Sequence, residues 1–481
     1  MRQLAELAEL FADSVIGDPV GVELTGITLA TADLRPGEVF VAIAGANRHG
    51  AEFAAAAAEA GAVAVITDAA GPAIAAGAGI PVLIVDNPRA LLGTLSAWVY
   101  GTGTGSDTLS GRALAAASKD LPPMPLLFGT TGTNGKTSVS HLLEGILQQV
   151  GAVTGLSSTA ERHIGDQIVV SRLTTPEASE MHALLALMRE RGVEAVAVEV
   201  SAQALSRHRV DGIVFDVAGF TNLSHDHLDD YADMREYFEA KAPLFQPDRA
   251  RRGVVSLDTA AGHEIVAGAG IPIVTVGTPA IAQDATAAAA ASWVVTIGDE
   301  VQAYTEFTLS GPDGRSLTTR VPVIGPHMAA NASLAIVMML EVGYEWDAIV
   351  NALTRDGGIR AYLPGRTERV SGDTGPAVFV DFGHSPDAFE KTLAAVRRVT
   401  PCKVLMLFGA DGDRDASKRL DMGRTAVEGS DILVVTDHHP RFEDTASIRA
   451  TLIAGERAAR PDAEIYENSP PEAAIVATVG L

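Results

Sequence analysis

The stretch LLFGTTGTNGKTSVSHLLEGILQQV at residues 126–150 decides the fold of the middle of the chain. Its apolar start predicts a buried strand, and the apolar positions that follow the loop repeat at the spacing of an amphipathic helix. The loop between them consists of Gly132, Thr133, Asn134, Gly135, Lys136, Thr137 and Ser138. Glycines let a backbone wrap closely around a phosphate group, and the start of a helix turns free N–H groups toward the anion. The stretch therefore predicts an ATP site, and a glycine-rich turn without a ligand is the alternative.

The residue types at the end of this loop fit the same chemistry. Lys136 is expected to reach the β- and γ-phosphates of ATP, and the hydroxyl of Thr137 is expected to bind Mg²⁺. The strict motif has glycine where this chain has Thr130, so the loop is a variant of the pattern. ATP and Mg²⁺ are the cofactors that the loop predicts.

Composition excludes several classes of protein. The chain has 481 residues, with 36 Lys and Arg against 60 Asp and Glu and a formal net charge of −24. A general nucleic-acid binder or a protein that docks on an anionic membrane needs a basic surface, so neither is expected. The single cysteine, Cys402, excludes a disulfide framework and a cysteine-rich zinc site. The N-terminal MRQLAELAEL has no basic segment followed by an apolar one, so a signal peptide is not expected there. These features predict a soluble, cytoplasmic protein.

The order of segments predicts an α/β fold with mostly parallel sheets, because strand-like and helix-like segments alternate almost throughout. We place domain boundaries so that the three domains span 1–122, 123–358 and 359–481. Residues 101–125 are rich in Gly, Thr, Ser and Pro and are expected to be a linker. Two apolar runs within 287–323 are typical of an antiparallel insert. In the last domain, AVFVDF (377–382), KVLMLFGA (403–410) and DILVVTD (431–437) predict three strands of a Rossmann-like sheet.

Further segments resemble a known family. They are TGTNGKT (131–137), TTPE (174–177), EVSAQALSRHRV (199–210), FTNLSHDHLD (220–229), YFEAKAPLF (237–245), Asn331, PGRTE (364–368), VDFGHSPDA (380–388) and FGADGDRDASKR (408–419). Together they resemble the Mur ligases and their folylpolyglutamate synthetase relatives, over essentially the whole chain. The resemblance implies a uridine-binding α/β domain, a central P-loop ATPase-like domain and a C-terminal Rossmann-like domain.

The resemblance also implies an activity. Mur ligases form amide bonds from ATP through an acyl-phosphate, and this chain looks closest to those that add the third amino acid, usually dibasic, to UDP-N-acetylmuramoyl-L-Ala-D-Glu. The expected partners are small molecules only, and the expected state is a monomer. Another Mur-type ligase, acting on folate, cyanophycin or a different muropeptide, is the first alternative. A non-catalytic paralogue that binds nucleotide is the second.

Four residues are expected to be catalytic. Glu199 is expected at the C-terminal end of a buried strand and His227 just past another, where α/β sheets place active residues, although a lone Glu or His there is usually structural. By resemblance they bind a second magnesium, and Lys241 is carbamylated by CO₂ and supports the metal site. Taken alone, Glu239 and Lys241 on one helix are a solvated charge pair. The catalytic set is thus Lys136, Glu199, His227 and Lys241, and the metal set is Thr137, Glu199, His227 and Lys241 as its carbamate.

The remaining site residues follow from the resemblance. Asn331, Arg366 and Asp381 are expected to hold the adenine, phosphates and ribose across a domain cleft, with His384 in the same loop. An arginine in PGR could also simply cap a loop. The residues expected to bind the UDP-sugar dipeptide or the incoming amino acid are Thr31, Asn47, Thr174, Thr175, Ser201, Arg209, Arg414, Lys418, Asp437, His438, His439 and Arg441.

The chain departs from the family pattern at two motifs. The uridine domain usually has Asp-Ser-Arg where this chain has Ala30, Thr31 and Ala32. The selectivity motif Asp-Asn-Pro-Arg of diaminopimelate-adding members is His438-His439-Pro440-Arg441 here, so lysine, ornithine or another diamino acid stays open. A literal Asp-Asn-Pro-Arg at 86–89 lies at a predicted helix start, where Asp86 or Asn87 is expected to be the cap.

The last expectation concerns the C-terminal end. The sequence ends at Leu481 within an apparent helix, whereas family members usually continue through one more strand and a Gly-Lys-Gly-His-Glu type loop. The resemblance thus implies that the chain is truncated or lacks this part of the amino-acid pocket.

Overall fold

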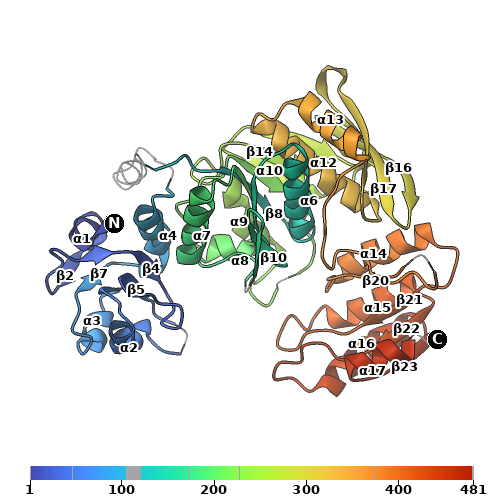
Figure 1. The fold of residues 1–481 in the computed structure, drawn as a ribbon. Coiled ribbons are helices and arrows are strands. Elements are labelled where there is room, and N and C mark those ends of the chain that lie inside the picture. The colour runs from blue at the N-terminus through green and yellow to red at the C-terminus, as the bar shows by residue number, and fades with distance from the viewer. Residues whose placement is uncertain are drawn as a thin grey trace.

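The structure is a computed structural model, and it describes residues 2–45, 47–103, 121–171, 173–226, 228–372 and 374–478. Figure 1 shows three groups of elements, blue at the N-terminal side, teal through green and yellow to light orange in the centre, and darker orange to red at the C-terminal side. Within these ranges, no helix is both long enough and apolar enough to cross a membrane.

The N-terminal group is built on a five-stranded sheet with the order β2-β7-β6-β5-β4, in which only the β2–β7 pair is antiparallel. Its strands are β2 (Ser14–Ile16), β4 (Gly26–Thr28), β5 (Glu38–Ala42), β6 (Ala64–Thr67) and β7 (Val82–Ile84), with a small β1 (Arg2–Gln3) and β3 (Glu23–Leu24) pair beside it. The helices are α1 (Leu4–Phe11), η1 (Gly50–Phe53), α2 (Ala54–Glu59), α3 (Gly71–Ala75) and α4 (Pro88–Tyr100). Asn87 caps α4, because its side chain accepts a hydrogen bond from the Ala90 amide at 3.1 Å. The prediction of a cap at this Asp-Asn-Pro-Arg segment is confirmed.

The central group is one sheet of 11 strands with the order β11-β10-β9-β12-β8-β13-β14-β15-β16-β17-β18. The strands from β9 to β16 are parallel, and the outer pairs at both ends are antiparallel. Their bounds are β8 (Leu126–Thr131), β9 (Thr154–Ser157), β10 (Glu161–Ile164), β11 (Gln167–Val170), β12 (Ala195–Glu199), β13 (Val217–Phe220), β14 (Gly253–Ser256), β15 (Ile273–Gly277), β16 (Trp293–Val301), β17 (Tyr304–Ser310) and β18 (Ser316–Val321). Because β8 lies between β12 and β13, the loops that follow these three strands meet at one edge of the sheet.

Helices cover both faces of the central sheet (Figure 1). They are α6 (Lys136–Gln149), α7 (Ala178–Glu190), α8 (Ala202–Ser206), α9 (Met234–Lys241), η2 (Ala242–Phe245), α10 (Ala260–Gly268), α11 (Ala285–Ala289), η3 (Pro312–Gly314), α12 (Pro326–Glu341) and α13 (Trp346–Asp356). On one face, Leu142 and Ile146 of α6 pack with Leu334 and Met338 of α12, all at most 2% exposed. On the other face, α7, α9 and η2 supply a second buried cluster. The strand and helix predicted from residues 126–150 are therefore the centre of the sheet and its cover.

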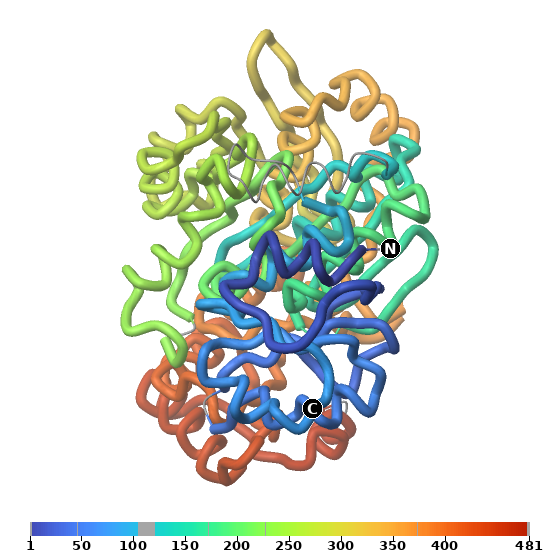
Figure 2. The backbone as a smooth tube through the Cα atoms, turned by 90° about the vertical axis from the view of Figure 1, so that its left-hand side faces the viewer, coloured from blue at the N-terminus to red at the C-terminus, as the bar shows by residue number. Residues whose placement is uncertain are grey.

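The antiparallel insert expected within 287–323 is confirmed as β16, β17 and β18. Along β17, buried and half-buried residues alternate, which is the pattern of a strand with one face on the core. The hairpin of β16 and β17 protrudes as the yellow loop at the top of Figure 2.

The C-terminal group has a parallel sheet with the order β21-β22-β23 and helices packed around it. Its elements are β19 (Glu368–Arg369), β20 (Phe379–Val380), α14 (Pro386–Val399), β21 (Leu405–Phe408), α15 (Arg419–Gly429), β22 (Ile432–Val435), α16 (Thr445–Ala459), β23 (Glu464–Glu467) and α17 (Pro471–Thr478). The expected Rossmann-like sheet is present, but the prediction that AVFVDF forms one of its strands is wrong. Only Phe379 and Val380 of that segment pair, antiparallel to β19, and the third parallel strand is β23. Since Val378, Val380 and Phe382 are 45–53% exposed, the segment is not buried between helices as a Rossmann strand would be.

Candidate active site

The loop between β8 and α6 is a phosphate-binding cradle that needs glycine at its first position. Gly132 has φ +147°, and a Cβ atom there would lie 1.9 Å from the hydroxyl oxygen of Thr221. That hydroxyl donates to the carbonyl of Asn134 at 2.6 Å, and the Asn134 amide donates to Oδ1 of Asn222 at 3.0 Å. The segment after β13 thus fixes the shape of the loop through these hydrogen bonds.

Lys136 curls back onto this loop. Its Nζ atom donates to the carbonyl oxygens of Gly132 at 3.1 Å and Thr133 at 2.9 Å. Burial lowers the pKa of this ammonium, while the carboxylate of Glu199 acts in the opposite direction. The contact of Lys136 with the phosphates of ATP remains a prediction. The lysine ammonium lies against the loop that is expected to enclose those phosphates.

Thr137, Glu199 and Arg366 meet at the start of α6. The Thr137 hydroxyl donates to Oε1 of Glu199 at 2.8 Å and accepts from Nη2 of Arg366 at 2.7 Å. Glu199 is 1% exposed, and its Oε2 atom accepts from the amide of Thr159. A hydroxyl and a carboxylate are the oxygen donors that Mg²⁺ prefers, so Thr137 and Glu199 fit the predicted metal site.

Lys241 lies on the same edge and is buried. Its side chain is 1% exposed, its Nζ atom donates to the Gly132 carbonyl at 3.0 Å, and it lies 4.2 Å from the centre of the Tyr237 ring. Burial, with the nearby Lys136 charge, holds the pKa of Lys241 well below its ordinary value. The interpretation of Glu239 and Lys241 as a solvated pair is therefore wrong, because Lys241 turns from the helix surface toward the P-loop. Helical spacing alone could not distinguish these two directions.

The fourth predicted catalytic residue, His227, lies outside the described residues. Its neighbour Asp226 is 4% exposed and faces the C-terminal group. The Oδ1 atom of Asp226 accepts from Lys418 at 2.8 Å, and its Oδ2 atom lies 3.5 Å from Nε2 of His384. Sequence reasoning missed Asp226, although it stands within the FTNLSHDHLD segment.

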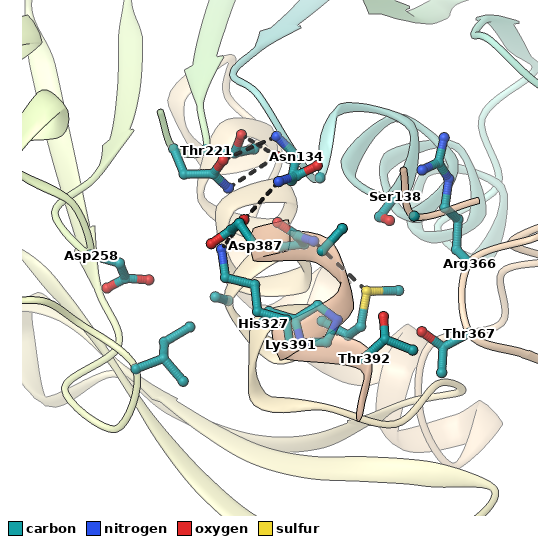
Figure 3. Close-up of a pocket in the computed structure, with 18 of the residues that line it drawn as sticks. Asn134, Ser138, Thr221, Asp258, His327, Arg366, Thr367, Asp387, Lys391 and Thr392 are labelled. Atoms are coloured by element: carbon teal, nitrogen blue, oxygen red, sulfur yellow. Dashed lines mark hydrogen bonds and ion pairs between the residues drawn. The ribbon is translucent and has the colours of Figure 1, made fainter. Parts of the chain in front are cut away.

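Seven of the predicted nucleotide residues line one pocket between the central and C-terminal groups (Figure 3), and the other four, Gly132, Thr133, Lys136 and Thr137, are not among its lining residues. Asn134, Gly135, Ser138, Asn331, Arg366, Asp381 and His384 are all among its lining residues. Gly135 has φ +92°, and a Cβ atom there would lie 2.7 Å from Oδ1 of Asn331. Asp381 holds the neighbouring turn, since its Oδ2 atom accepts from the amide of Thr367 at 2.7 Å and from its hydroxyl at 3.0 Å. The fold thus brings together residues that are far apart in the sequence: Thr137 and Arg366, which are hydrogen-bonded, are 229 positions apart.

Two further pocket residues were missed by the sequence analysis. Oδ2 of Asp387 accepts from Nδ2 of Asn134 at 2.7 Å and from Nζ of Lys391 at 2.8 Å, so it ties α14 to the P-loop (Figure 3). Phe382 is 53% exposed within the pocket wall, and the Arg366 guanidinium lies 4.9 Å from the centre of its ring. Both stand in the VDFGHSPDA segment, but nothing in its pattern distinguishes them from structural residues.

Three of the predicted dipeptide residues surround Glu199. The Thr175 hydroxyl donates to the Glu199 carbonyl at 2.7 Å and accepts from the Ser201 amide at 3.2 Å, and the Thr159 hydroxyl donates to that of Thr174 at 3.0 Å. Ser201 is also the cap of α8. These contacts place the three residues beside the metal-site carboxylate.

Arg209 is one of the residues expected to bind the substrate, and in the structure its guanidinium contacts a carboxylate of the protein. Its Nε atom lies 3.0 Å from Oε1 of Glu177, and the other oxygen of Glu177 lies 2.6 Å from Nη1 of Arg89. Arg89 belongs to α4 of the N-terminal group, so Glu177 joins the two groups through paired arginines.

The candidates of the C-terminal group lie on two adjoining loops, joined by a hydrogen bond from the Gly412 amide to the His439 carbonyl at 2.9 Å. His438 pairs with Asp411 at 2.7 Å, and Asp437 pairs with Arg449. Nη1 of Arg414 lies 3.5 Å from Oδ2 of Asp229, and Arg441 is exposed with φ +53°. Within the described part of the chain, no cluster of three or more His, Cys, Asp or Glu side chains could hold a metal ion.

Thr31 and Asn47 lie in the N-terminal group, in turns after β4 and β5. Thr31 is half-buried and Asn47 is exposed. The structure does not bring these two residues to the P-loop, and their uridine contacts remain predictions.

Comparison with known proteins decides the family. The chain is 55% identical over 480 residues to a UDP-N-acetylmuramyl-tripeptide synthetase of Leifsonia xyli subsp. xyli. The aligned region covers 100% of this chain and 88% of the relative. The chain belongs to the Mur ligase family. The models for the Mur ligase family catalytic domain, the Mur ligase middle domain and the Mur ligase glutamate ligase domain match residues 23–100, 130–339 and 365–479.

Other relatives of this Mur ligase agree. A UDP-N-acetylmuramoyl-L-alanyl-D-glutamate–2,6-diaminopimelate ligase of Streptomyces avermitilis is 41% identical, over 98% of this chain and 88% of its own length. A solved structure of an enzyme with that name has a TM-score of 0.65 at 23% identity, covering 98% of this chain and 90% of the other. A D-alanyl-D-alanyl-adding ligase from Acinetobacter baumannii also has a TM-score of 0.65, at 17% identity and with coverages of 99% and 91%. These likenesses confirm the expected three-domain Mur ligase fold.

Proposed function

We propose that this Mur ligase is an ATP-dependent amide ligase that adds a diamino acid to UDP-N-acetylmuramoyl-L-alanyl-D-glutamate. The observation that carries the proposal is the convergence of Thr137, Glu199 and Arg366, with 2.8 Å and 2.7 Å contacts at the Thr137 hydroxyl, at the end of a P-loop. The names of the relatives supply the substrate: one is a UDP-N-acetylmuramyl-tripeptide synthetase and another a 2,6-diaminopimelate ligase. The exposed guanidinium of Arg441 offers a contact for a distal carboxylate of such an amino acid.

The reaction needs two steps at one site. A carboxylate oxygen of the substrate glutamate attacks the γ-phosphorus of ATP, forming an acyl-phosphate as the bond to the β-phosphate oxygen breaks and ADP leaves. The amino group of the incoming amino acid then attacks the acyl carbon, inorganic phosphate leaves, and the amine loses a proton. Lys136 and Arg366 lie where their charges would offset those of the phosphates. Closure of the pocket by α14, through Asp387 and Asn134, would keep water from the acyl-phosphate.

Magnesium would be held by the Thr137 hydroxyl and the Glu199 carboxylate, which are already 2.8 Å apart, together with His227. When bound, Mg²⁺ supplies charge neutralisation of the phosphate oxygens. The protein prepares this position by burying Glu199 and fixing its second oxygen with the Thr159 amide. A buried, oriented carboxylate is a better ligand than a mobile one.

Lys241 carries the carbamate in this proposal. Carbamylation needs a neutral amine, since the nitrogen lone pair attacks the carbon of CO₂ and one proton is released as the carbamate anion forms. Burial and the Lys136 charge lower the pKa of Lys241 and so favour that neutral form. The product is an anion beside Lys136 and the Gly132 carbonyl, where it would offset the positive charge of the P-loop.

The other site residues complete the proposal. Thr31 and Asn47 would contact the uridine. The dipeptide would be bound by Thr174, Thr175, Ser201 and Arg209. The residues of the C-terminal group that would face the central group and bind the amino acid are Arg414, Lys418, Asp437, His438, His439 and Arg441. We propose that the three domains meet after residues 122 and 358. A monomer in the cytoplasm is the state we propose, and the solution mass of the purified chain tests the first part of it.

The proposal is tested by measuring phosphate release from ATP with UDP-N-acetylmuramoyl-L-alanyl-D-glutamate and a panel of meso-diaminopimelate, L-lysine, L-ornithine and L-alanine. We expect release only when a diamino acid is present, together with the tripeptide mass in the product. No release with any member of the panel would contradict the function. Release with L-alanine alone would contradict the diamino-acid assignment.

A further inference from the structure

One face of α6 carries four residues that each contact the same segment, residues 358–366, which we call the interdomain linker because it connects α13 to β19. The four are Thr137, His141, Gly145 and Gln149. They are spaced by four positions, and residues at this spacing lie on the same face of a helix. Figure 1 shows the linker leaving the region of α13 and descending beside α6 toward β20.

At the C-terminal end of α6, both ends of the Gln149 amide bind the linker backbone. Its Nε2 atom donates to the Gly358 carbonyl at 3.0 Å, and its Oε1 atom accepts from the Arg360 amide at 2.9 Å. This pair fixes the linker where it leaves α13.

One turn earlier, the linker backbone lies directly on Gly145. A Cβ atom at this position would lie 2.5 Å from the Arg360 carbonyl oxygen and 2.9 Å from the Cβ atom of Ala361. Glycine weakens a helix interior relative to alanine, so its presence in the middle of α6 needs a reason. The close approach of the linker provides that reason.

Another turn earlier, His141 contacts both the interdomain linker and the loop of residues 158–160, whose Thr159 amide donates to Glu199. Its Nδ1 atom donates to the Tyr362 carbonyl at 3.0 Å, and its Nε2 atom lies 3.1 Å from the Ser158 hydroxyl. That hydroxyl accepts from the Ala160 amide at 3.2 Å and so helps to shape the loop whose Thr159 amide donates to Glu199.

The contacts run in one direction. As the linker runs from Gly358 to Arg366, it contacts α6 at successively earlier residues. These contacts are Gly358 with Gln149, Arg360 with Gly145, Tyr362 with His141, and Arg366 with the Thr137 hydroxyl at 2.7 Å. We propose that this face of α6 is a track that sets the position of the interdomain linker. His141, Gly145 and Gln149 are thus positioning residues that deliver Arg366 to the phosphate site. The role of Arg366 toward ATP rests on the proposed function, whereas the track itself is a property of the fold.

The first test replaces Gly145 with alanine in the full chain. The added methyl group must move the linker, and a misplacement of about 1 Å at a catalytic group costs on the order of a hundredfold in rate. We expect kcat to fall on the order of tenfold to a hundredfold, with faster amide hydrogen exchange in residues 359–363. Gly268→Ala at the exposed end of α10, where no atom lies within 4 Å of the new Cβ, is the matched control and should change neither. A Gly145→Ala variant with a higher Tm, unchanged kcat and unchanged linker exchange would overturn the proposal.

The second test separates the two contacts of His141 and does not depend on how Gly145→Ala folds. Asparagine can place a donor near the Nδ1 position and keep the Tyr362 contact, whereas glutamine can keep the Ser158 contact. We expect the rate of amide hydrogen exchange in the interdomain linker to be close to that of the wild type in His141→Asn and to be faster in His141→Gln. ATP binding should be weaker only in His141→Gln. Equal exchange in both variants and the wild type, or the reverse order, would overturn the track.

The two failures are distinguishable, because linker exchange and binding of ATP are measured without turnover. A wild-type chain with no ligase activity but with the expected exchange pattern would contradict the proposed function and leave the track supported. An active wild type whose Gly145 and His141 variants behave like wild type would contradict the track alone.

Discussion

The Nζ atom of Lys418 lies 2.8 Å from Oδ1 of Asp226, although the two residues are 192 positions apart. Lys418 belongs to the loop before α15 in the C-terminal group, and Asp226 follows β13 in the central group. Both are buried, at 8% and 4% exposure, so the ion pair is shielded from solvent. Oδ2 of Asp226 also lies 3.5 Å from His384. One carboxylate therefore joins two segments of the C-terminal group to the edge that carries the P-loop.

Removing the ammonium group of this pair should impair domain closure. In Lys418→Met, Asp226 keeps its place but loses its buried cationic partner, and such a loss costs about 3–5 kcal/mol. We expect kcat to fall on the order of a hundredfold, with the KM for the UDP-dipeptide changed less. Lys403→Met, which removes an exposed lysine of the same domain, is the control. A normal kcat in Lys418→Met would show that closure does not use this pair.

The hydroxyl of Thr137 should be essential, and its methyl group should not. Thr137→Val keeps the shape but removes the oxygen that contacts Glu199 at 2.8 Å and Arg366 at 2.7 Å. We expect this variant to lose on the order of a hundredfold in kcat/KM for ATP and to need more Mg²⁺. Thr137→Ser keeps the hydroxyl and should stay within about threefold of wild type. Titrations of Mg²⁺ against phosphate release measure both, and equal profiles for Val and Ser would exclude a metal role for the hydroxyl.

The parts of the site that the sequence predicted are those encoded by local pattern. A strand, a glycine-rich loop and a helix in direct succession define the P-loop, and Glu199 stands at the end of an apolar run that forms β12. Both patterns depend only on residues that are close together in the sequence, so they can be recognised without knowledge of the tertiary structure.

Burial and long-range pairing were not predictable in the same way. Lys241 stands on a helix with several charged residues, and only the packing of α9 against the P-loop buries it. Asp226 and Asp387 have their partners 192 and 253 positions away, across a domain interface. The AVFVDF segment has the composition of a buried strand, yet it pairs with β19, because pairing partners are set by tertiary contacts.

Activity should depend on dissolved CO₂ through Lys241. The low pKa of this buried amine favours the neutral form that reacts with CO₂. We expect turnover to fall in CO₂-depleted buffer and to recover with bicarbonate, and a carbamate signal to appear in the ¹³C spectrum with labelled bicarbonate. Lys241→Arg keeps a cation but cannot form the carbamate, so it should lose on the order of a hundredfold in kcat and not respond to bicarbonate. A fully active Lys241→Arg, or a wild type indifferent to CO₂, would refute the carbamate.

Glu456 should destabilise the C-terminal group at neutral and alkaline pH. It is 0% exposed on α16, and within the described residues neither carboxylate oxygen has a hydrogen-bond partner. Burial raises the pKa of this carboxyl from 4.5 to about 7. Below pH 4.5 it is protonated in both states; between 4.5 and 7 the unfolded chain ionises first, and the folded state loses relative stability. We therefore expect Glu456→Gln to be more stable than wild type by about 1–3 kcal/mol at pH 8, and by less at pH 5. Urea unfolding at both pH values measures this difference, with the exposed Glu428→Gln on α15 as the control, and a difference that does not grow with pH would contradict the penalty.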